Sequence, residues 1–168
     1  MQTHSQTHAA HGTNAMADHK PGGHYGRFAL MLLLSFACMY ALMYAMVDRF
    51  ANVVPNVNQF YMAALMTAPM AILELALMGA MYQDKKKNMA IYLLAAVVLV
   101  ASWFGIRLQA GVGDQQFLKS MIPHHAGAIL MCEEATLSDA EVRALCDGIV
   151  KGQEAEIALM KSMIDKGR

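Results

Sequence analysis

The sequence has few charged residues. Only 15% of its 168 residues are Asp, Glu, Lys or Arg, the formal net charge is zero, and 57% of the residues are hydrophobic. Because soluble domains carry about 25% charged residues, this composition indicates a membrane protein. The sequence also has no phosphate-binding loop, nucleotide motif or nucleophile–base pair, so we do not expect an enzyme. The C-terminal segment is neither basic nor rich in aromatic residues, and nucleic acid is not expected as a partner.

Three long runs contain almost no charge. They cover residues 28–47, residues 58–82 with Glu74 as the exception, and residues 90–106. Each run is close to the roughly 20 residues that a membrane-spanning helix needs. We therefore predict an all-α chain with a three-helix transmembrane region over residues 28–107. The first run is long and is followed by further spans, so it is not interpreted as a cleavable signal peptide.

The positions of the basic residues predict the orientation. Lys85, Lys86 and Lys87 lie in the short turn between the second and third runs, and Lys20 and Arg27 precede the first run. The excess of Lys and Arg on cytoplasmic loops places both segments in the cytoplasm. The prediction is a multi-pass protein of a bacterial inner membrane, with the lipid bilayer as partner. Residues after about 108 would then be periplasmic.

Residues 1–27 form a polar tail. Too few apolar residues are present to bury a core, so the tail is predicted to be disordered. As an alternative, a His-rich tract can collect metal ions. The tail contains five histidines, His4, His8, His11, His19 and His24.

Residues 114–168 predict a helical hairpin. The first helix would run to about residue 135, with Pro123 inside it, and residues 136–138 would form the turn. Ser138 then resembles an N-cap, with Glu141 three residues later completing a capping box. Because so small a hairpin buries little apolar surface, it must dock on something. Self-association of hairpins into a four-helix bundle, and hence a homo-oligomer, is the simplest solution.

The predicted hairpin carries the residues with a recognisable chemistry. At about 100° per residue, the sulfur and imidazole side chains of residues 121–132 fall within an arc of roughly 120°. Folding the hairpin brings Met160 of the second helix towards Met121. Thioether and imidazole ligands suit a soft metal, with Cu(I) as the first candidate. The alternative is that the methionines fill a core and the histidines pack or form a polar face. The candidate ligands are Met121, His124, His125, Met131 and Met160.

Two cysteines flank the predicted turn at similar distances. Cys132 and Cys146 should face each other near the closed end of the hairpin, where an extracytoplasmic location permits a disulfide. Such a bond would close a loop of about 15 residues. The alternative is that one or both thiols bind metal. Cys38, in the first run, is expected to be a buried, inert thiol.

The hairpin also resembles a known family. The pattern Met121-Ile-Pro-His124-His125-x-x-Ala128-Ile129-x-Met131, followed by Gln153-x-x-Glu156-Ile157-x-x-Met160, is similar to the family of the domain of unknown function 305. The resemblance implies a ferritin-like helical bundle of the periplasmic type that binds copper through His and Met. The preceding spans resemble the membrane-anchored subgroup. Longer members carry additional helices, so a site shared between subunits is an alternative to one within a single hairpin.

The second run contains a stripe of methionines at intervals of four. One interpretation is a membrane path for a soft cation, with Glu74 as an acidic waypoint near mid-membrane that faces the bundle interior. Met-x-x-x-Met in the second of three spans is similar to high-affinity copper importers, although the Gly-x-x-x-Gly of their third span is absent. The alternative is methionine as adaptable helix-packing filler. The stripe consists of Met62, Met66, Met70, Glu74 and Met78.

The combined prediction is a membrane-anchored protein of metal homeostasis. It would sequester Cu(I) or hand it to copper-handling partner proteins through the His and Met ligands of the hairpin. A copper transporter or channel component that uses the methionine stripe is one alternative. A structural partner of a larger membrane complex, whose His-His pair only packs, is the other.

Overall fold

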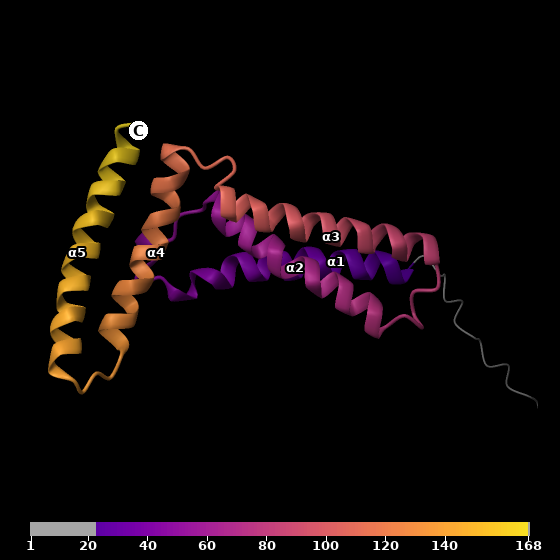
Figure 1. Ribbon diagram of the computed structural model, residues 1–168, viewed down its shortest axis with the longest axis horizontal. Coiled ribbons are helices and arrows are strands. Elements are labelled where there is room, and N and C mark those ends of the chain that lie inside the picture. The colour runs from indigo at the N-terminus through magenta and orange to yellow at the C-terminus, as the bar shows by residue number, and fades with distance from the viewer. Residues whose placement is uncertain (1–22, 168) are drawn as a thin grey trace, which may run out of the picture.

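Five α-helices make up most of residues 23–167. The computed structural model describes residues 23–167, and that part of the chain contains helices and no strand, which confirms the all-α prediction. Two short 3₁₀ turns, η1 and η2, separate the first two helices (Figure 1). The elements are α1 (Gly23–Leu42), η1 (Met43–Met46), η2 (Phe50–Asn52), α2 (Val57–Leu77), α3 (Lys85–Leu108), α4 (Asp114–Glu134) and α5 (Ala140–Asp165).

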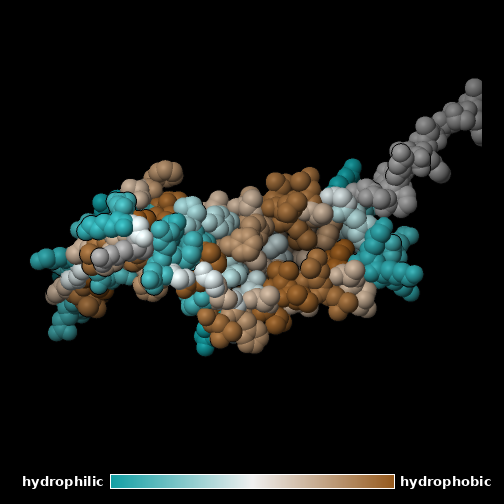
Figure 2. Space-filling view, turned by 90° about the horizontal axis from the view of Figure 1, so that it is seen from above, coloured by the Kyte–Doolittle hydropathy of each residue, from teal (hydrophilic) through white to brown (hydrophobic). Residues whose placement is uncertain are grey.

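Helices α1 to α3 pack together and are called the membrane region below because of their length and composition. All three are long and apolar enough to cross a membrane. Figure 2 shows apolar surface over these helices, with hydrophilic surface at both ends of the molecule. Residues 1–22 of the predicted tail lie outside the described residues. Residues 23–27 are helical, so α1 begins earlier than the sequence predicted. The Tyr25 hydroxyl explains the longer helix, since it donates to Asn88 Oδ1 at 2.8 Å and so anchors the start of α1 on α3.

Helix α2 packs against both α1 and α3. Its buried face consists mainly of alanine. In lipid no hydrophobic force drives helices together, and small side chains instead allow close packing of the helix backbones. The helix ends at Leu77, whereas the apolar run continues to Tyr82, because Gly79 and a turn follow. Glu74 therefore lies one turn from the end of α2, which corrects its predicted mid-membrane position. The buried residues of α2 are Ala63, Ala64, Ala68, Ala71 and Leu75.

Helices α4 and α5 lie side by side and run in opposite directions (Figure 1). Their core combines aliphatic residues of both helices with Met160 of α5. The N-cap of α5 is Asp139 rather than the predicted Ser138, because α5 begins at Ala140 and the residue immediately before it supplies the cap. The Asp139 carboxylate accepts from the backbone N–H groups of Glu141 and Val142 at 2.8 and 3.0 Å.

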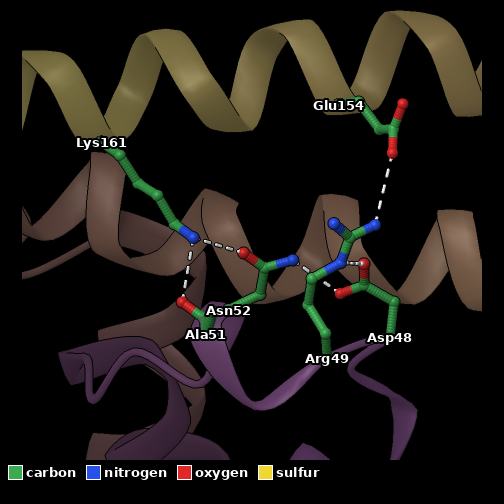
Figure 3. Close-up of polar contacts among 6 residues, drawn as sticks. All are labelled: Asp48, Arg49, Ala51, Asn52, Glu154 and Lys161. Carbon is green, nitrogen blue, oxygen red and sulfur yellow. Dashed lines mark hydrogen bonds and ion pairs between the residues drawn. The ribbon is translucent and has the colours of Figure 1, made fainter.

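The α4–α5 pair docks on the membrane region of the same chain. Helix α4 lies across the end of α1 to α3 that is opposite the α2–α3 loop, and α5 lies on its outer side (Figure 1). Figure 3 shows the polar contacts that fasten α5 to residues 48–52. Lys161 Nζ donates to Ala51 O at 2.9 Å and to Asn52 Oδ1 at 2.6 Å, and Arg49 pairs with Glu154 at 3.3 Å. Docking covers part of the apolar surface of the pair within one chain, while Leu145 and Leu159 of α5 remain 63% and 55% exposed.

Candidate functional site

The two adjacent histidines point in different directions. His124 is exposed and lines a cavity between α4 and the membrane region. The side chain of His125 is only 12% exposed, and its Nδ1 atom lies 3.0 Å from Glu156 Oε2 on α5. Successive residues of an α-helix differ by about 100°, so neighbouring side chains can lie on different faces. The pair therefore supplies one imidazole to the cavity and one to the interior of the α4–α5 pair.

The surroundings of His125 favour its neutral form. Burial lowers the pKa of His125, the nearby Glu156 carboxylate acts in the opposite direction, and His124 lowers it further. Although Glu156 lies close, the buried Nδ1 atom makes no hydrogen bond of good geometry. A neutral imidazole is the form that binds metal. The neighbour of the His125 imidazole is, however, the Glu156 carboxylate and not a methionine sulfur.

The cavity has a volume of about 570 Å³ and is lined from two sides. One wall is the face of α4, and the other comes from η1, α2 and the end of α3. The lining combines thioether groups from both walls with the imidazole of α4. These soft side chains are Met43, Met46, Met62, Met121, His124 and Met131.

Hydrogen bonds hold α4 over this cavity. The backbone N–H of Val57, the first residue of α2, donates to Gln116 Oε1 of α4 at 3.1 Å. Asn58 Nδ2 donates to Ser120 Oγ at 3.3 Å, and also to Gln109 Oε1 at 2.9 Å. These partly buried contacts set the position of the first turns of α4 relative to the start of α2. The two walls are therefore fixed to each other next to the soft side chains.

The structure divides the predicted ligand set. Met121, His124 and Met131 line the cavity. Met160 is buried in the core between α4 and α5, and His125 faces Glu156, so neither lines it. Met43 and Met46 also line the cavity, and neither of them was assigned to a site from the sequence. The sequence placed both methionines at the end of the first apolar run, which is the end that α4 contacts in the structure.

The donor set limits the chemistry of this cavity. Within residues 23–167 no group of three or more His, Cys, Asp and Glu side chains lies close enough together to hold a metal ion. Hard-metal sites built from carboxylates and histidine-rich zinc sites are therefore not found in this part of the chain. Thioether sulfur with one imidazole instead matches the ligands that select Cu(I).

The methionine stripe of α2 lies mostly on the outside of the membrane region. Met62, Met66 and Met78 are 45%, 49% and 40% exposed, while Met70 and Glu74 are half-buried. Alanines occupy the buried face, so the stripe does not line a channel inside one chain. Met62 is nevertheless part of the cavity wall. The stripe thus begins at the cavity and continues along the exposed surface of α2.

Cys132 and Cys146 are joined by a disulfide in the structure, with their Cα atoms 5.3 Å apart. The bond links the end of α4 to the first half of α5, next to the turn. Cys38 is free and exposed on α1, so the expectation of a buried thiol is wrong. The reason is that no other helix of residues 23–167 covers the surface of α1 that faces away from α2.

Comparisons with known proteins agree with this division into two regions. Residues 106–164, which contain α4 and almost all of α5, match the family described as Domain of unknown function (DUF305). An uncharacterized protein of Acanthamoeba polyphaga mimivirus is 30% identical over 140 residues, or 82% of this chain and 90% of the viral protein. That similarity therefore extends well into the membrane region. No solved structure matches the chain significantly. On this evidence the chain belongs to the DUF305 family.

Proposed function

We propose that this protein binds a soft metal ion, Cu(I) in the first instance, at the outer surface of a membrane. One observation carries the proposal: Met121, His124 and Met131 lie on the same face of α4 and line one cavity. Thioether and imidazole groups are neutral ligands of the kind that Cu(I) prefers. Methionine has three rotatable bonds, so its sulfur can move to a metal ion without a change in the backbone.

The proposed orientation puts the cavity outside the cytoplasm. Lys85, Lys86 and Lys87 begin α3 at the end of the membrane region opposite α4. The positive-inside rule places this lysine cluster in the cytoplasm and the α4–α5 pair in the periplasm of an inner membrane. A disulfide between Cys132 and Cys146 fits an oxidising compartment of that kind.

The accessibility of the ligands favours storage and transfer over catalysis. Met131 is 56% exposed, and His124 is also exposed, so a metal-carrying partner protein has direct access to two of the proposed ligands. Exchange of Cu(I) between neutral ligands needs no proton release from a thiol. The proposed role is sequestration of Cu(I) or its delivery to a copper-handling partner.

Transport through the membrane is a second candidate, because Met62 belongs both to the cavity wall and to the stripe of α2. Since the stripe is exposed on a single chain, a conducting path would require a second copy to cover it. Alanine at Met66 and Met70 should then abolish cellular copper uptake, while Leu73→Ala on the same helix should leave it unchanged. Normal uptake by the Met66 and Met70 variants would eliminate this function.

The test of metal binding is a Cu(I) titration of the full-length protein in detergent micelles against a chromogenic chelator. His124→Ala and Met121→Leu should each weaken binding by about tenfold, which corresponds to the loss of about 1.4 kcal/mol. Met160→Leu is the matched control, because Met160 lies in the core of the same helix pair and does not line the cavity. A wild-type protein that cannot compete with the chelator would refute the proposed function.

A further inference from the structure

The cavity receives as many methionines from the membrane region as sulfur and imidazole groups from α4. Met43 and Met46 come from η1, and Met62 comes from the second turn of α2. Helix α4 contributes two thioethers and the His124 imidazole. A site made by α4 alone would leave half of the soft lining without a role.

The 3₁₀ turn η1 aligns two of these methionines. Helix α1 is α-helical as far as Leu42 and then tightens into a 3₁₀ helix over Met43–Met46. In a 3₁₀ helix with three residues per turn, side chains three positions apart are eclipsed. Continued α-helix would separate the same two side chains by about 60°. The change of helix type therefore puts Met43 and Met46 on one edge, and both line the cavity.

Gly127 brings this edge against α4. A Cβ atom at Gly127 would lie 3.4 Å from the backbone oxygen of Met46 and 3.9 Å from its Cβ atom. The backbone of α4 thus runs directly past Met46. Gly127 follows His124 by three residues and lies on the same side of the helix. Met46 is therefore next to the helical turn that carries the imidazole.

Met62 is fixed from the other direction. The start of α2 is bonded to α4 through Val57 and Asn58, and Met62 follows within about one turn. Its side chain is not buried in the alanine face of α2, so packing in the membrane region does not hold it away from the cavity. Thioethers from two elements of the membrane region thus meet the soft face of α4.

From this arrangement, and on the basis of the proposed function, we infer that the soft-metal site is shared between the two regions. Met43, Met46 and Met62 supply thioether ligands from the membrane region, opposite Met121, His124 and Met131 of α4. Metal binding then depends on the docking of α4. The contacts of Lys161 with Ala51 and Asn52, and of Arg49 with Glu154, preserve the site without touching the metal (Figure 3).

The experiment uses the full-length protein in detergent micelles and a Cu(I) titration against a chromogenic chelator. The triple variant Met43→Leu/Met46→Leu/Met62→Leu should bind Cu(I) at least tenfold more weakly than wild type. Leucine keeps the size and apolar character of the side chain but removes the sulfur. The matched control is Met31→Leu/Met39→Leu/Met89→Leu, which removes three sulfur atoms from the membrane region outside both the cavity and the α2 stripe and should bind like wild type.

X-ray absorption of the Cu(I)-loaded protein gives a second readout. Helix α4 alone offers two thioethers, so three or more sulfur neighbours per copper require a contribution from the membrane region or a second chain. The triple variant should then show fewer sulfur neighbours per copper than wild type. The single variant Met46→Leu should lose one sulfur neighbour, and it provides the test if the triple variant does not fold. Lys161→Ala should weaken binding several-fold with the sulfur count of the bound form unchanged.

The outcomes separate the two levels of the proposal. If wild type binds Cu(I) and the triple variant binds equally well with the same sulfur count, the shared site is wrong and the α4 site stands. If wild type does not bind Cu(I), both proposals fail. If the control variant loses as much Cu(I) affinity as the triple variant, the effect comes from helix packing in the membrane region and the shared site is again wrong.

Discussion

The two regions of this protein differ in the side chains that fill their main helix contacts. In the membrane region α2 buries alanines such as Ala64 and Ala68, whereas large residues such as Leu33, which is 68% exposed, point outward. In the α4–α5 pair the largest fully buried side chains are Ile122 and Ile129, and the outside carries charged residues together with exposed apolar ones such as Leu145. Lipid is as apolar as leucine, so membrane helices gain from close backbone packing rather than from burial of large groups. Water reverses this preference, because it favours burial of the largest apolar surfaces.

The cavity lies where these two packing rules meet. Methionine suits both environments, since it is apolar, flexible and polarisable. The methionines of η1 and α2 belong to the membrane region, and those of α4 belong to the other region, yet they line the same space. The comparison therefore suggests that the regions can be perturbed separately, with the cavity responding to both.

The largest expected effect comes from removing a large side chain from the α4–α5 core. Ile129→Ala should lower the free energy of unfolding of that pair by about 2–5 kcal/mol, because it leaves a cavity around a fully buried position. Leu33→Ala on the outside of α1 should change stability by only about 0.5 kcal/mol. Amide hydrogen exchange of the full-length protein in micelles measures both. Equal losses would show that the regions do not follow different packing rules.

Loss of the disulfide should also act on one region. Cys132→Ser/Cys146→Ser removes a bond between residues 14 apart and should destabilise the α4–α5 pair by about 3 kcal/mol in the chain-entropy model. Hydrogen exchange should rise in α4 and α5 and stay constant in α2 and α3. Alkylation without reductant, followed by mass spectrometry, checks the bond itself: both thiols should be protected in wild type. Full alkylation would show that the bond does not form.

Enlarging a side chain should damage the membrane region instead. Ala68→Leu places extra methylene groups at a buried contact of α2 and should destabilise the three-helix region by about 1–3 kcal/mol. Ala76→Leu, on an exposed face of the same helix, is the matched control. Unfolding in mixed micelles with increasing SDS measures both variants. If Ala68→Leu unfolds at the same SDS fraction as wild type, close approach of the helices is not what stabilises this region.

The smallest expected effect is a pH dependence at the start of α3. Asp84 accepts hydrogen bonds from the backbone N–H groups of Lys86 and Lys87, and the bond from Lys87 is the largest cause that lowers the pKa of Asp84. A carboxyl group with a lowered pKa stabilises the folded state above its usual pKa of about 3.9 and loses this contribution as the pH falls. Thermal unfolding of wild type should therefore be more sensitive to acid than that of Asp84→Asn. Identical pH profiles would contradict this assignment.

The sequence predicted the helices well because their signals are local. The three apolar runs predicted the three long apolar helices, the predicted end of the first hairpin helix lies one residue from the end of α4, and the predicted cap lies one residue from the observed cap of α5. The errors occurred where packing or a cap overrides composition. The apolar run around Met78 continues past the end of α2, so Glu74 was placed too deep, and residues 23–27 joined α1 because Tyr25 bonds to Asn88.

The candidate site was predicted only in part, for a geometric reason. Helical periodicity identified Met121, His124 and Met131 as neighbours, because residues on one helix have fixed relative angles. The same arithmetic grouped His125 with them, and folding of the predicted hairpin added Met160, although these two residues face the interior of the helix pair. An arc of about 120° is wide enough to include both the cavity face and the buried face.

The sequence by itself determined the all-α fold, three helices long and apolar enough to cross a membrane, the helix pair and the family, since these follow from apolar run lengths, periodicity and motif spacing. Tertiary structure alone decided that α4 lies across the ends of the membrane helices, that His124 and His125 separate, and that Met43, Met46 and Met62 meet α4. The contacts that join the two regions link residues up to 110 positions apart, and no local pattern fixes which helix ends come together. Their positions follow from the fit of Gly127 on Met46 and from the polar contacts of Lys161 and Arg49.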